Sequence, residues 1–214
     1  MRFRSLDEKY MAMALRLAAK ARGRTSPNPM VGAIVVRDGK VVGRGYHRKA
    51  GAPHAEAIAL KKAGAAAEGA TLYVTLEPCS HVDKRTPPCT PLVIQGGITR
   101  AVVAMIDPNP KVSGGGLKAL RAAGIEAVTG VLEAEAKRLN EAFIKHVTTG
   151  APFVTLKIAQ TLDGKIATAR GESQWITGEM AREEGHRLRD INDAILVGIN
   201  TVLKDDPALT TRIT

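Results

Sequence analysis

The sequence has few of the residues that would place it in several protein classes. Two cysteines in 214 residues cannot form a framework of several disulfides, and such sparse cysteine is typical of the reducing cytosol. No apolar run approaches the roughly 18 residues of a membrane-spanning helix, and the N-terminal segment lacks the apolar core of a signal peptide. We therefore expect a soluble, cytoplasmic protein without membrane attachment.

Aromatic residues are also scarce, at 3% of the chain, with Trp175 the single tryptophan. Proteins that bind single-stranded nucleic acid stack bases on aromatic side chains, and this chain offers few. The charge is uneven: residues 1–150 carry 23 Lys and Arg against 12 Asp and Glu, whereas residues 151–214 carry 8 against 9. Such a basic first part indicates an anionic partner, and we favour a phosphorylated small molecule over nucleic acid.

The pattern of apolar residues predicts an α/β fold. Ser5 and Glu8 have the spacing of a capping box, and the apolar residues after them recur at helical spacing over residues 6–22. A hairpin over residues 31–45, turning at Asp38-Gly39, comes next. The elements predicted after it are helices at 55–62, 91–95, 117–123 and 132–146, and strands at 71–76, 101–106 and 125–128. This alternation predicts a sheet with helices on both faces.

The segment Thr148-Thr149-Gly150-Ala151-Pro152 is the best candidate for a domain boundary, because the charge balance changes there. We therefore expect domains at 1–148 and 149–214. The elements predicted after the boundary are strands at 153–159, 165–168 and 194–198, a turn at Asp163-Gly164 and a helix near 179–189. Residues 151–214 number 64, below the usual size of a complete α/β domain, so we expect this second domain to be incomplete.

The sharpest motif is His54-Ala55-Glu56, followed by Pro78-Cys79 and, ten residues later, Cys89. Zinc prefers Cys and His ligands, and a catalytic zinc keeps three protein ligands plus an open position for water. His54, Cys79 and Cys89 supply three such ligands. Glu56 lies two residues from His54 and suits an acid that exchanges protons without binding the metal. Pro78-Cys79 follows a predicted strand, so the thiolate would lie near a helix N-terminus, which lowers its pKa.

The order of these residues matches the signature of zinc-dependent base deaminases, H-x-E followed by P-C-x-x-C. One departure is that nine residues, rather than two, separate Cys79 from Cys89. Each of these residues alone would more often be an ordinary core residue. Their combination in this order favours a metal site.

Further motifs carry a closer resemblance. In chain order they are Pro27-Asn28-Pro29, Thr75-Leu76-Glu77-Pro78-Cys79-Ser80-His81, Arg85-Thr86-Pro87-Pro88-Cys89, Asp107-Pro108-Asn109-Pro110, Leu162-Asp163-Gly164-Lys165 and Gly171-Glu172-Ser173-Gln174-Trp175-Ile176-Thr177. With them the chain resembles the bifunctional riboflavin biosynthesis deaminase/reductase family over essentially its whole length. In that family a long loop already separates the two cysteines. Here that loop is one residue longer, and the extra residue lies within 82–84.

The resemblance implies a cytidine-deaminase-like zinc domain followed by the start of a dihydrofolate-reductase-like domain. The first domain would hydrolyse an amine of a diaminopyrimidine ribosylamino 5'-phosphate and release ammonia, in riboflavin biosynthesis. Glu56 would be the catalytic acid and base, and His54, Cys79 and Cys89 the Zn²⁺ ligands. The implied substrate-binding residues are Asn28, His47, His81, Arg85, Asp107 and Asn109, with Arg85 suited to phosphate. Because Asn28, Asp107 and Asn109 each adjoin a proline, turn formation is an alternative role for them.

The second domain, when complete, would reduce the ribosyl group with NADPH. The implied cofactor-binding residues are Ala159, Trp175, Thr201 and Asp205. The implied residues for the reductase substrate are Ser173, Arg189, Leu209 and Arg212, with the two arginines as phosphate partners. Ordinary packing is an alternative explanation for Ala159, Leu209 and Trp175.

Two other functions stay open at this point. A nucleic-acid deaminase acting on tRNA would use the same zinc motif and the basic first part of the chain. A non-catalytic structural zinc module would need a fourth protein ligand. Residues 171–177 have no role in either alternative, which favours the deaminase/reductase. The sequence leaves homo-oligomerisation open.

Overall fold

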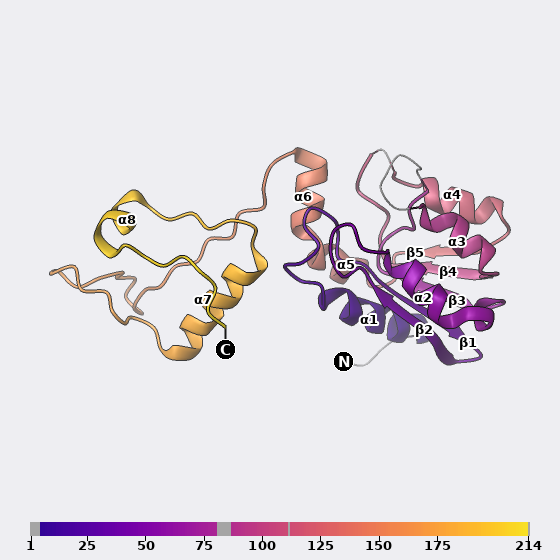
Figure 1. Ribbon diagram of the computed structural model, residues 1–214, viewed down its shortest axis with the longest axis horizontal. Coiled ribbons are helices and arrows are strands. Elements are labelled where there is room, and N and C mark those ends of the chain that lie inside the picture. The colour runs from indigo at the N-terminus through magenta and orange to yellow at the C-terminus, as the bar shows by residue number, and fades with distance from the viewer. Residues whose placement is uncertain (1–4, 81–86, 111, 214) are drawn as a thin grey trace. The chain divides into compact units, whose positions relative to one another are not determined.

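The computed structural model describes residues 5–80, 87–110 and 112–213. It divides into two units, Met1–Phe153 and Val154–Thr214, each drawn in Figure 1. No helix among the described residues is both long enough and apolar enough to cross a membrane.

The first unit is built on a five-stranded sheet with the order β2-β1-β3-β4-β5. The predicted hairpin is present as β1 (Gly32–Arg37) and β2 (Lys40–Tyr46), and Asp38 and Gly39 take the positive φ angles that its turn requires. β1 also pairs antiparallel with β3 (Thr71–Val74). β4 (Arg100–Val103) and β5 (Glu126–Thr129) then extend the sheet in parallel.

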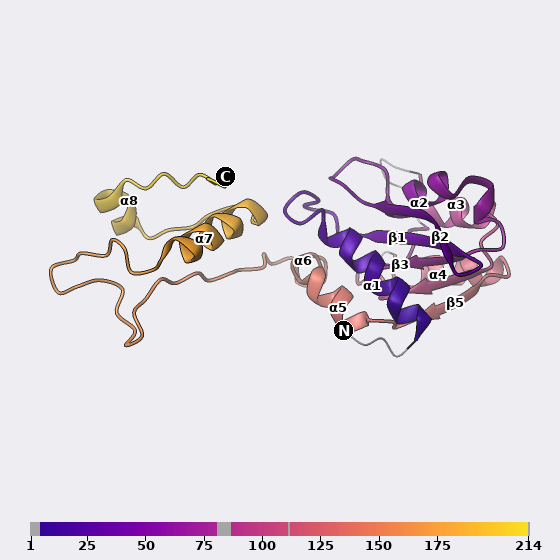
Figure 2. The same ribbon diagram turned by 90° about the horizontal axis from the view of Figure 1, so that it is seen from below.

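Helices cover both faces of this sheet, as the alternating pattern predicts. Figure 2 shows α1 (Leu6–Ala19) on one side and α2 (Ala55–Ala63) with α3 (Cys89–Gln95) on the other. The remaining helices of the unit are the 3-10 turn η1 (Gly64–Ala67), α4 (Gly115–Ala122), α5 (Glu133–Leu139) and α6 (Glu141–Thr149). Ile34 and Val102 on one face of the sheet, and Leu72 on the other, are fully buried members of the hydrophobic core.

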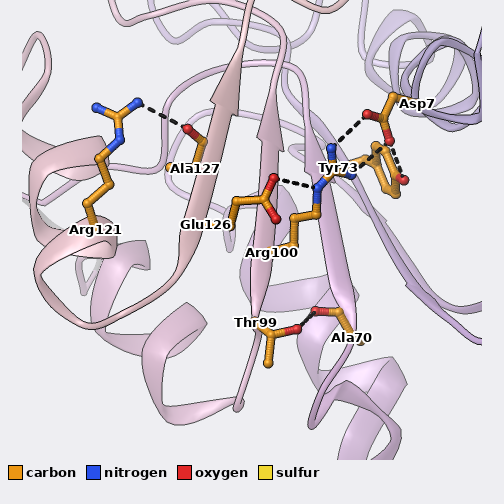
Figure 3. A network of polar contacts seen from close by, with 8 residues as sticks. All are labelled: Asp7, Ala70, Tyr73, Thr99, Arg100, Arg121, Glu126 and Ala127. Carbon is orange, nitrogen blue, oxygen red and sulfur yellow. Dashed lines mark hydrogen bonds and ion pairs between the residues drawn. The ribbon is translucent and has the colours of Figure 1, made fainter.

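Helix α1 is fixed to the sheet by polar contacts as well as by its apolar face. Ser5 caps it as predicted, because its hydroxyl accepts a hydrogen bond from the Glu8 amide at 3.2 Å. The Arg100 guanidinium donates to both carboxylate oxygens of Asp7, and the Tyr73 hydroxyl donates to one of them at 2.8 Å (Figure 3). These contacts join the first helix to strands β3 and β4.

Helix α2 lies unusually close to strand β2, and glycine allows this approach. A Cβ atom at Gly45 would lie 2.2 Å from the carbonyl oxygen of Ala55, closer than real Cβ contacts occur. Gly45 therefore admits the first turn of α2, which carries His54 at its N-cap and Glu56 in its first turn. This packing determines where the predicted metal ligand lies.

The prediction of one continuous helix over 132–146 is wrong at its middle. The chain forms α5 and α6 separately, and Asn140 lies between them with φ −108° and ψ 23°. The Asn140 side chain accepts from the Met30 amide at 2.8 Å and donates to the Met30 carbonyl at 3.0 Å. This pair of tertiary contacts with Met30 accompanies the break between the two helices.

The second unit contains the predicted helix as α7 (Glu179–Ile191), and also α8 (Ile199–Asp205). The strands predicted at 153–159, 165–168 and 194–198 are not present among its described residues. An extended segment becomes a strand only when a neighbour satisfies its backbone hydrogen bonds, and the apolar pattern cannot show whether a neighbour is present. None of the described residues of this unit is buried.

Candidate metal centre and substrate cavity

The topology brings four of the predicted site residues of the first unit to one edge of the sheet. β3 and β4 are parallel, so the segments that follow them, which contain Cys79 and Asp107, leave the sheet at the same edge. β1 is antiparallel to β3, and β2 is antiparallel to β1. Asn28, which precedes β1, and His47, which follows β2, therefore lie at this edge too.

His54, Cys79 and Cys89 form a compact cluster, with potential ligand atoms within 4.8 Å of one another. His54 Nδ1 lies 3.6 Å from Cys79 Sγ and 3.2 Å from Cys89 Sγ. A tetrahedral zinc with ordinary bond lengths separates its nitrogen and sulfur ligands by about 3.6 Å. The donor types and their spacing therefore fit Zn²⁺.

The two cysteines are fixed to each other through backbone contacts. The Cys89 amide, at the start of α3, lies 3.0 Å from the Cys79 carbonyl oxygen and 3.2 Å from Cys79 Sγ. The Thr90 hydroxyl donates to the same carbonyl at 3.0 Å. Cys79 thus lies near a helix N-terminus, as predicted. The helix is α3, which begins at Cys89, ten residues further along the chain.

Glu56 is a buried acid beside this cluster, with 3% of its surface exposed. Its Oε2 atom is buried and has no hydrogen-bond partner among the described residues. Burial raises the pKa of this carboxyl above its ordinary value, and the nearby Cys79 raises it further. An unpaired buried carboxylate oxygen next to potential metal ligands suits a proton acceptor whose partner is a substrate or a water molecule.

The cluster opens into a cavity of about 610 Å³ in the first unit. Its lining residues are Pro27, Asn28, Pro29, Val31, His47, Ala50, Gly51, Ala52, His54, Glu56, Leu76, Glu77, Cys79, Asp107, Asn109, Val112 and Phe143. A cavity of this size is in the usual range for small-molecule sites. Of the predicted substrate-binding residues, His81 and Arg85 lie outside the described residues, and the other four line the cavity.

Asn28 and His47 contact each other in the cavity wall, with Asn28 Nδ2 3.1 Å from His47 Nε2. The other ring nitrogen of His47 lies 3.2 Å from the Pro53 carbonyl oxygen. Burial lowers the pKa of His47, which favours a neutral ring that donates through Nδ1 and accepts from Asn28 through Nε2. The Asn28 amide also donates to the Thr25 carbonyl at 2.7 Å, so turn formation and a place in the cavity coexist.

Asp107 and Asn109 likewise combine both roles. The Asn109 amide donates to Asp107 Oδ1 at 2.9 Å, which is the side-chain turn expected next to proline. Both residues line the same cavity as Asn28 and His47.

Sequence reasoning assigned no role to three residues that shape this site. Glu77 is buried and accepts four backbone hydrogen bonds, and a charged residue directly after a buried strand is a signal for such a role. Asn140 binds both polar backbone atoms of Met30, close to Asn28. Phe143, on α6, lines the cavity, and no local sequence pattern indicated it.

The predicted reductase residues are only partly brought together in the second unit. Arg189 and Arg212 both donate to the carbonyl oxygen of Thr210. Thr201 and Asp205 share helix α8. Trp175 is 71% exposed, and its ring lies 4.7 Å from the guanidinium of Arg182. Ser173 is exposed, whereas Ala159 and Leu209 are half-buried.

Comparison with known proteins gives two family matches. Residues 4–105 match the cytidine and deoxycytidylate deaminase zinc-binding region, and this range contains His54, Glu56, Cys79 and Cys89. Residues 152–214 match the RibD C-terminal domain.

The riboflavin biosynthesis protein RibD of Aquifex aeolicus is 58% identical to this chain over 209 residues. The resemblance to the riboflavin deaminase/reductase family is confirmed. The aligned region covers 98% of this chain and 58% of the A. aeolicus protein, so the chain spans little more than half the length of this RibD relative.

Solved RibD structures agree with the sequence match. One form of Acinetobacter baumannii RibD gives a TM-score of 0.91 at 48% identity, covering 96% of this chain and 58% of that one. A Thermotoga maritima diaminohydroxyphosphoribosylaminopyrimidine deaminase/5-amino-6-(5-phosphoribosylamino)uracil reductase gives 0.90 at 52% identity, covering 96% and 59%. The cavity residues Asp107, Asn109 and Phe143 lie beyond the residues that match the zinc-binding region, which end at 105.

Proposed function

We propose that the first unit is a zinc-dependent deaminase that acts in riboflavin biosynthesis on a diaminopyrimidine ribosylamino 5'-phosphate. The observation that carries this proposal is the cluster of His54, Cys79 and Cys89 beside the unpaired, buried Oε2 atom of Glu56, with His54, Cys79 and Glu56 lining a cavity. The T. maritima relative is named for deamination of this compound, and the aligned region covers 96% of the present chain.

In this proposal His54, Cys79 and Cys89 bind the metal and Glu56 moves the protons. When bound, zinc supplies the Lewis acidity that makes a hydroxide nucleophile available near neutral pH. Glu56 Oε2 accepts one proton of the attacking water and donates it to the ring nitrogen. The same carboxyl then accepts the second proton of that water, now a hydroxyl group on the ring carbon, and donates it to the departing amine. The raised pKa of Glu56 favours this role because it makes the carboxyl a stronger base than an exposed glutamate.

The cavity wall orients the pyrimidine. Asn28, fixed by its contact with His47, presents an amide group that can bind the polar edge of a base. Asp107 and Asn109 supply further carboxylate and amide oxygens, which suit ring-substituent and ribose hydroxyl groups. We assign the phosphate to Arg85 and a further substrate contact to His81, on the family resemblance alone.

We further propose that the region 149–214 begins an NADPH-dependent reductase domain, as its match to the RibD C-terminal domain supports. Its described residues do not by themselves fit a bound dinucleotide: none is buried, and Trp175 is 71% exposed. Cofactor sites bury most of the surface of their ligand.

Ammonia release tests the proposed function directly. The zinc-loaded 214-residue chain is given the diaminopyrimidine ribosylamino 5'-phosphate, its dephosphorylated form, or tRNA. We expect ammonia from the phosphorylated compound, with a lower KM than for the dephosphorylated one. The basic composition of residues 1–150 also predicts a KM that rises with salt. Equal efficiency with both small molecules would refute phosphate recognition, and ammonia from tRNA alone would establish the nucleic-acid alternative.

A further inference from the structure

Glu77 is a buried carboxylate whose oxygens bind backbone amides from two separate segments. Oε2 accepts from the Asp107 amide at 3.2 Å and from the Gly114 amide at 2.9 Å. Oε1 accepts from the Gly116 amide at 2.8 Å and from the Leu117 amide at 3.1 Å. Only 3% of the Glu77 surface is exposed.

These four contacts explain how a negative charge is stabilised in the interior. Burial of a carboxylate is costly unless hydrogen bonds replace its water, and here four N–H groups do so. Three of them lie at the start of α4, where the helix dipole also favours negative charge. The glycine-rich segment 114–116, whose amides could otherwise bind a phosphate, thus binds an internal carboxylate.

A second observation joins the same segment to the metal-ligand loop. A Cβ atom at Gly116 would lie 2.0 Å from the carbonyl oxygen of Pro78, the residue before Cys79. The first turn of α4 is therefore in direct contact with the backbone that carries this ligand. On the other side, the Val112 and Ser113 amides donate to the carbonyl oxygen of Asn109.

We propose that Glu77 is a positioning residue of the deaminase, which fixes Asp107 and Asn109 in the cavity wall relative to Cys79. This inference rests on the proposed function and extends it to a residue that acts through backbone amides. Glu77 binds the Asp107 amide directly, and Asp107 in turn accepts from the Asn109 amide at 2.9 Å. Loss of the Glu77 contacts would leave these two side chains free to move away from the substrate.

The variant E77Q tests this role in the full chain. A glutamine amide keeps the shape of glutamate but replaces one acceptor oxygen with a donor group, so it cannot accept from two of the four amides. We expect zinc content to stay near one per chain. We expect KM to rise at least about tenfold while kcat changes much less, because substrate placement is lost and Glu56 is untouched. We also expect faster amide hydrogen exchange at the two amides that lose their acceptor, either Asp107 and Gly114 or Gly116 and Leu117.

Two controls separate positioning from stability. D7N removes a hydrogen-bonded carboxylate that does not line the cavity, and it should lower stability without raising KM. In a double-mutant cycle with N109A, E77Q should add little to the KM already raised by N109A, because both changes affect the same contact with substrate. A KM increase in D7N equal to that in E77Q would overturn the proposal.

The remaining outcomes are also decisive. Unchanged KM in folded, zinc-loaded E77Q would overturn the positioning role. If E77Q does not fold, E77D keeps the charge on a side chain one methylene shorter, and it should show a raised KM with kcat close to wild type; an unchanged KM in folded, zinc-loaded E77D would then overturn the proposal. Failure of both variants to fold would assign Glu77 to structure alone. If the wild-type chain releases no ammonia, the proposed function fails, but unchanged exchange at the four amides in E77Q would still overturn the Glu77 role separately.

Discussion

The Arg100 guanidinium binds both carboxylate oxygens of Asp7, with each nitrogen–oxygen distance 2.9 Å, across 93 residues of sequence (Figure 3). The hydrogen bond from Arg100 has the largest effect on the pKa of Asp7; it outweighs the opposing effect of burial and, with a smaller contribution from Tyr73, lowers this pKa below its ordinary value. Helix α1 and strand β4 are thereby joined by a contact whose strength depends on pH.

The first prediction is that D7N destabilises the chain at pH 7 by about 1 kcal/mol, the scale of a partly exposed charged hydrogen bond. Because the folded pKa of Asp7 is lowered, its stabilisation is complete above the unfolded pKa near 4. It is lost as the pH falls through the lowered folded pKa. Urea unfolding followed by circular dichroism should therefore show a wild-type advantage that is constant above about pH 5 and shrinks below pH 4.

The matched control for D7N is E133Q, which removes an exposed ion pair with Lys137 on helix α5. Exposed pairs of this kind contribute little to stability, so the free energy of unfolding of E133Q should stay close to that of the wild type. If the difference in stability between D7N and wild type persisted unchanged at low pH, the ion pair with Arg100 would not be the cause of the lower stability of D7N.

The second prediction concerns the metal. The purified chain should contain about one zinc, and H54A, C79A and C89A should each lose it, because three ligands leave no spare donor. Metal analysis after dialysis measures this. N28A, which changes the same cavity but removes no predicted ligand, should retain zinc. Stoichiometric zinc in C89A would refute the proposed ligand set.

The third prediction is that this 214-residue chain does not oxidise NADPH with the deaminated intermediate as substrate. Hydride transfer requires the cofactor and the sugar to be fixed within reacting distance, and none of the described residues of the second unit is buried. NADPH absorbance follows the reaction, with the T. maritima relative, which is named as a reductase, as the positive control. Steady turnover by this chain would contradict the prediction.

The sequence predicted most of the first unit because its elements are specified locally. The Asp38-Gly39 turn, the Ser5 cap and the alternating apolar runs each correspond to an observed element. The break at Asn140 could not be predicted, because it coincides with contacts to Met30, 110 residues away. The prediction of strands in the second unit failed for a related reason. Strand pairing depends on tertiary contacts, which an apolar pattern does not show.

The candidate site likewise contains some residues that could be predicted from the sequence and others that could not. Motif order indicated His54, Glu56, Cys79 and Cys89, because metal chemistry restricts residue types strongly. The role of Glu77 depends on four backbone amides, and any residue type can supply an amide. Phe143 reaches the cavity only through the placement of α6, so tertiary structure was needed to find it.

The measurement that tests the account most directly is ammonia release by zinc-loaded wild type and E56Q, with zinc determined on the same samples. Glu56 Oε2 is the buried, unpaired acceptor beside the ligand cluster, so E56Q should keep its zinc. Its deamination rate should fall by a factor of about 10² or more, the scale of a positioned acid and base. E68Q, at an exposed glutamate, should match the wild type in both zinc content and deamination rate. Near-normal ammonia release by zinc-loaded E56Q would contradict the account, because the protons would then move through another group.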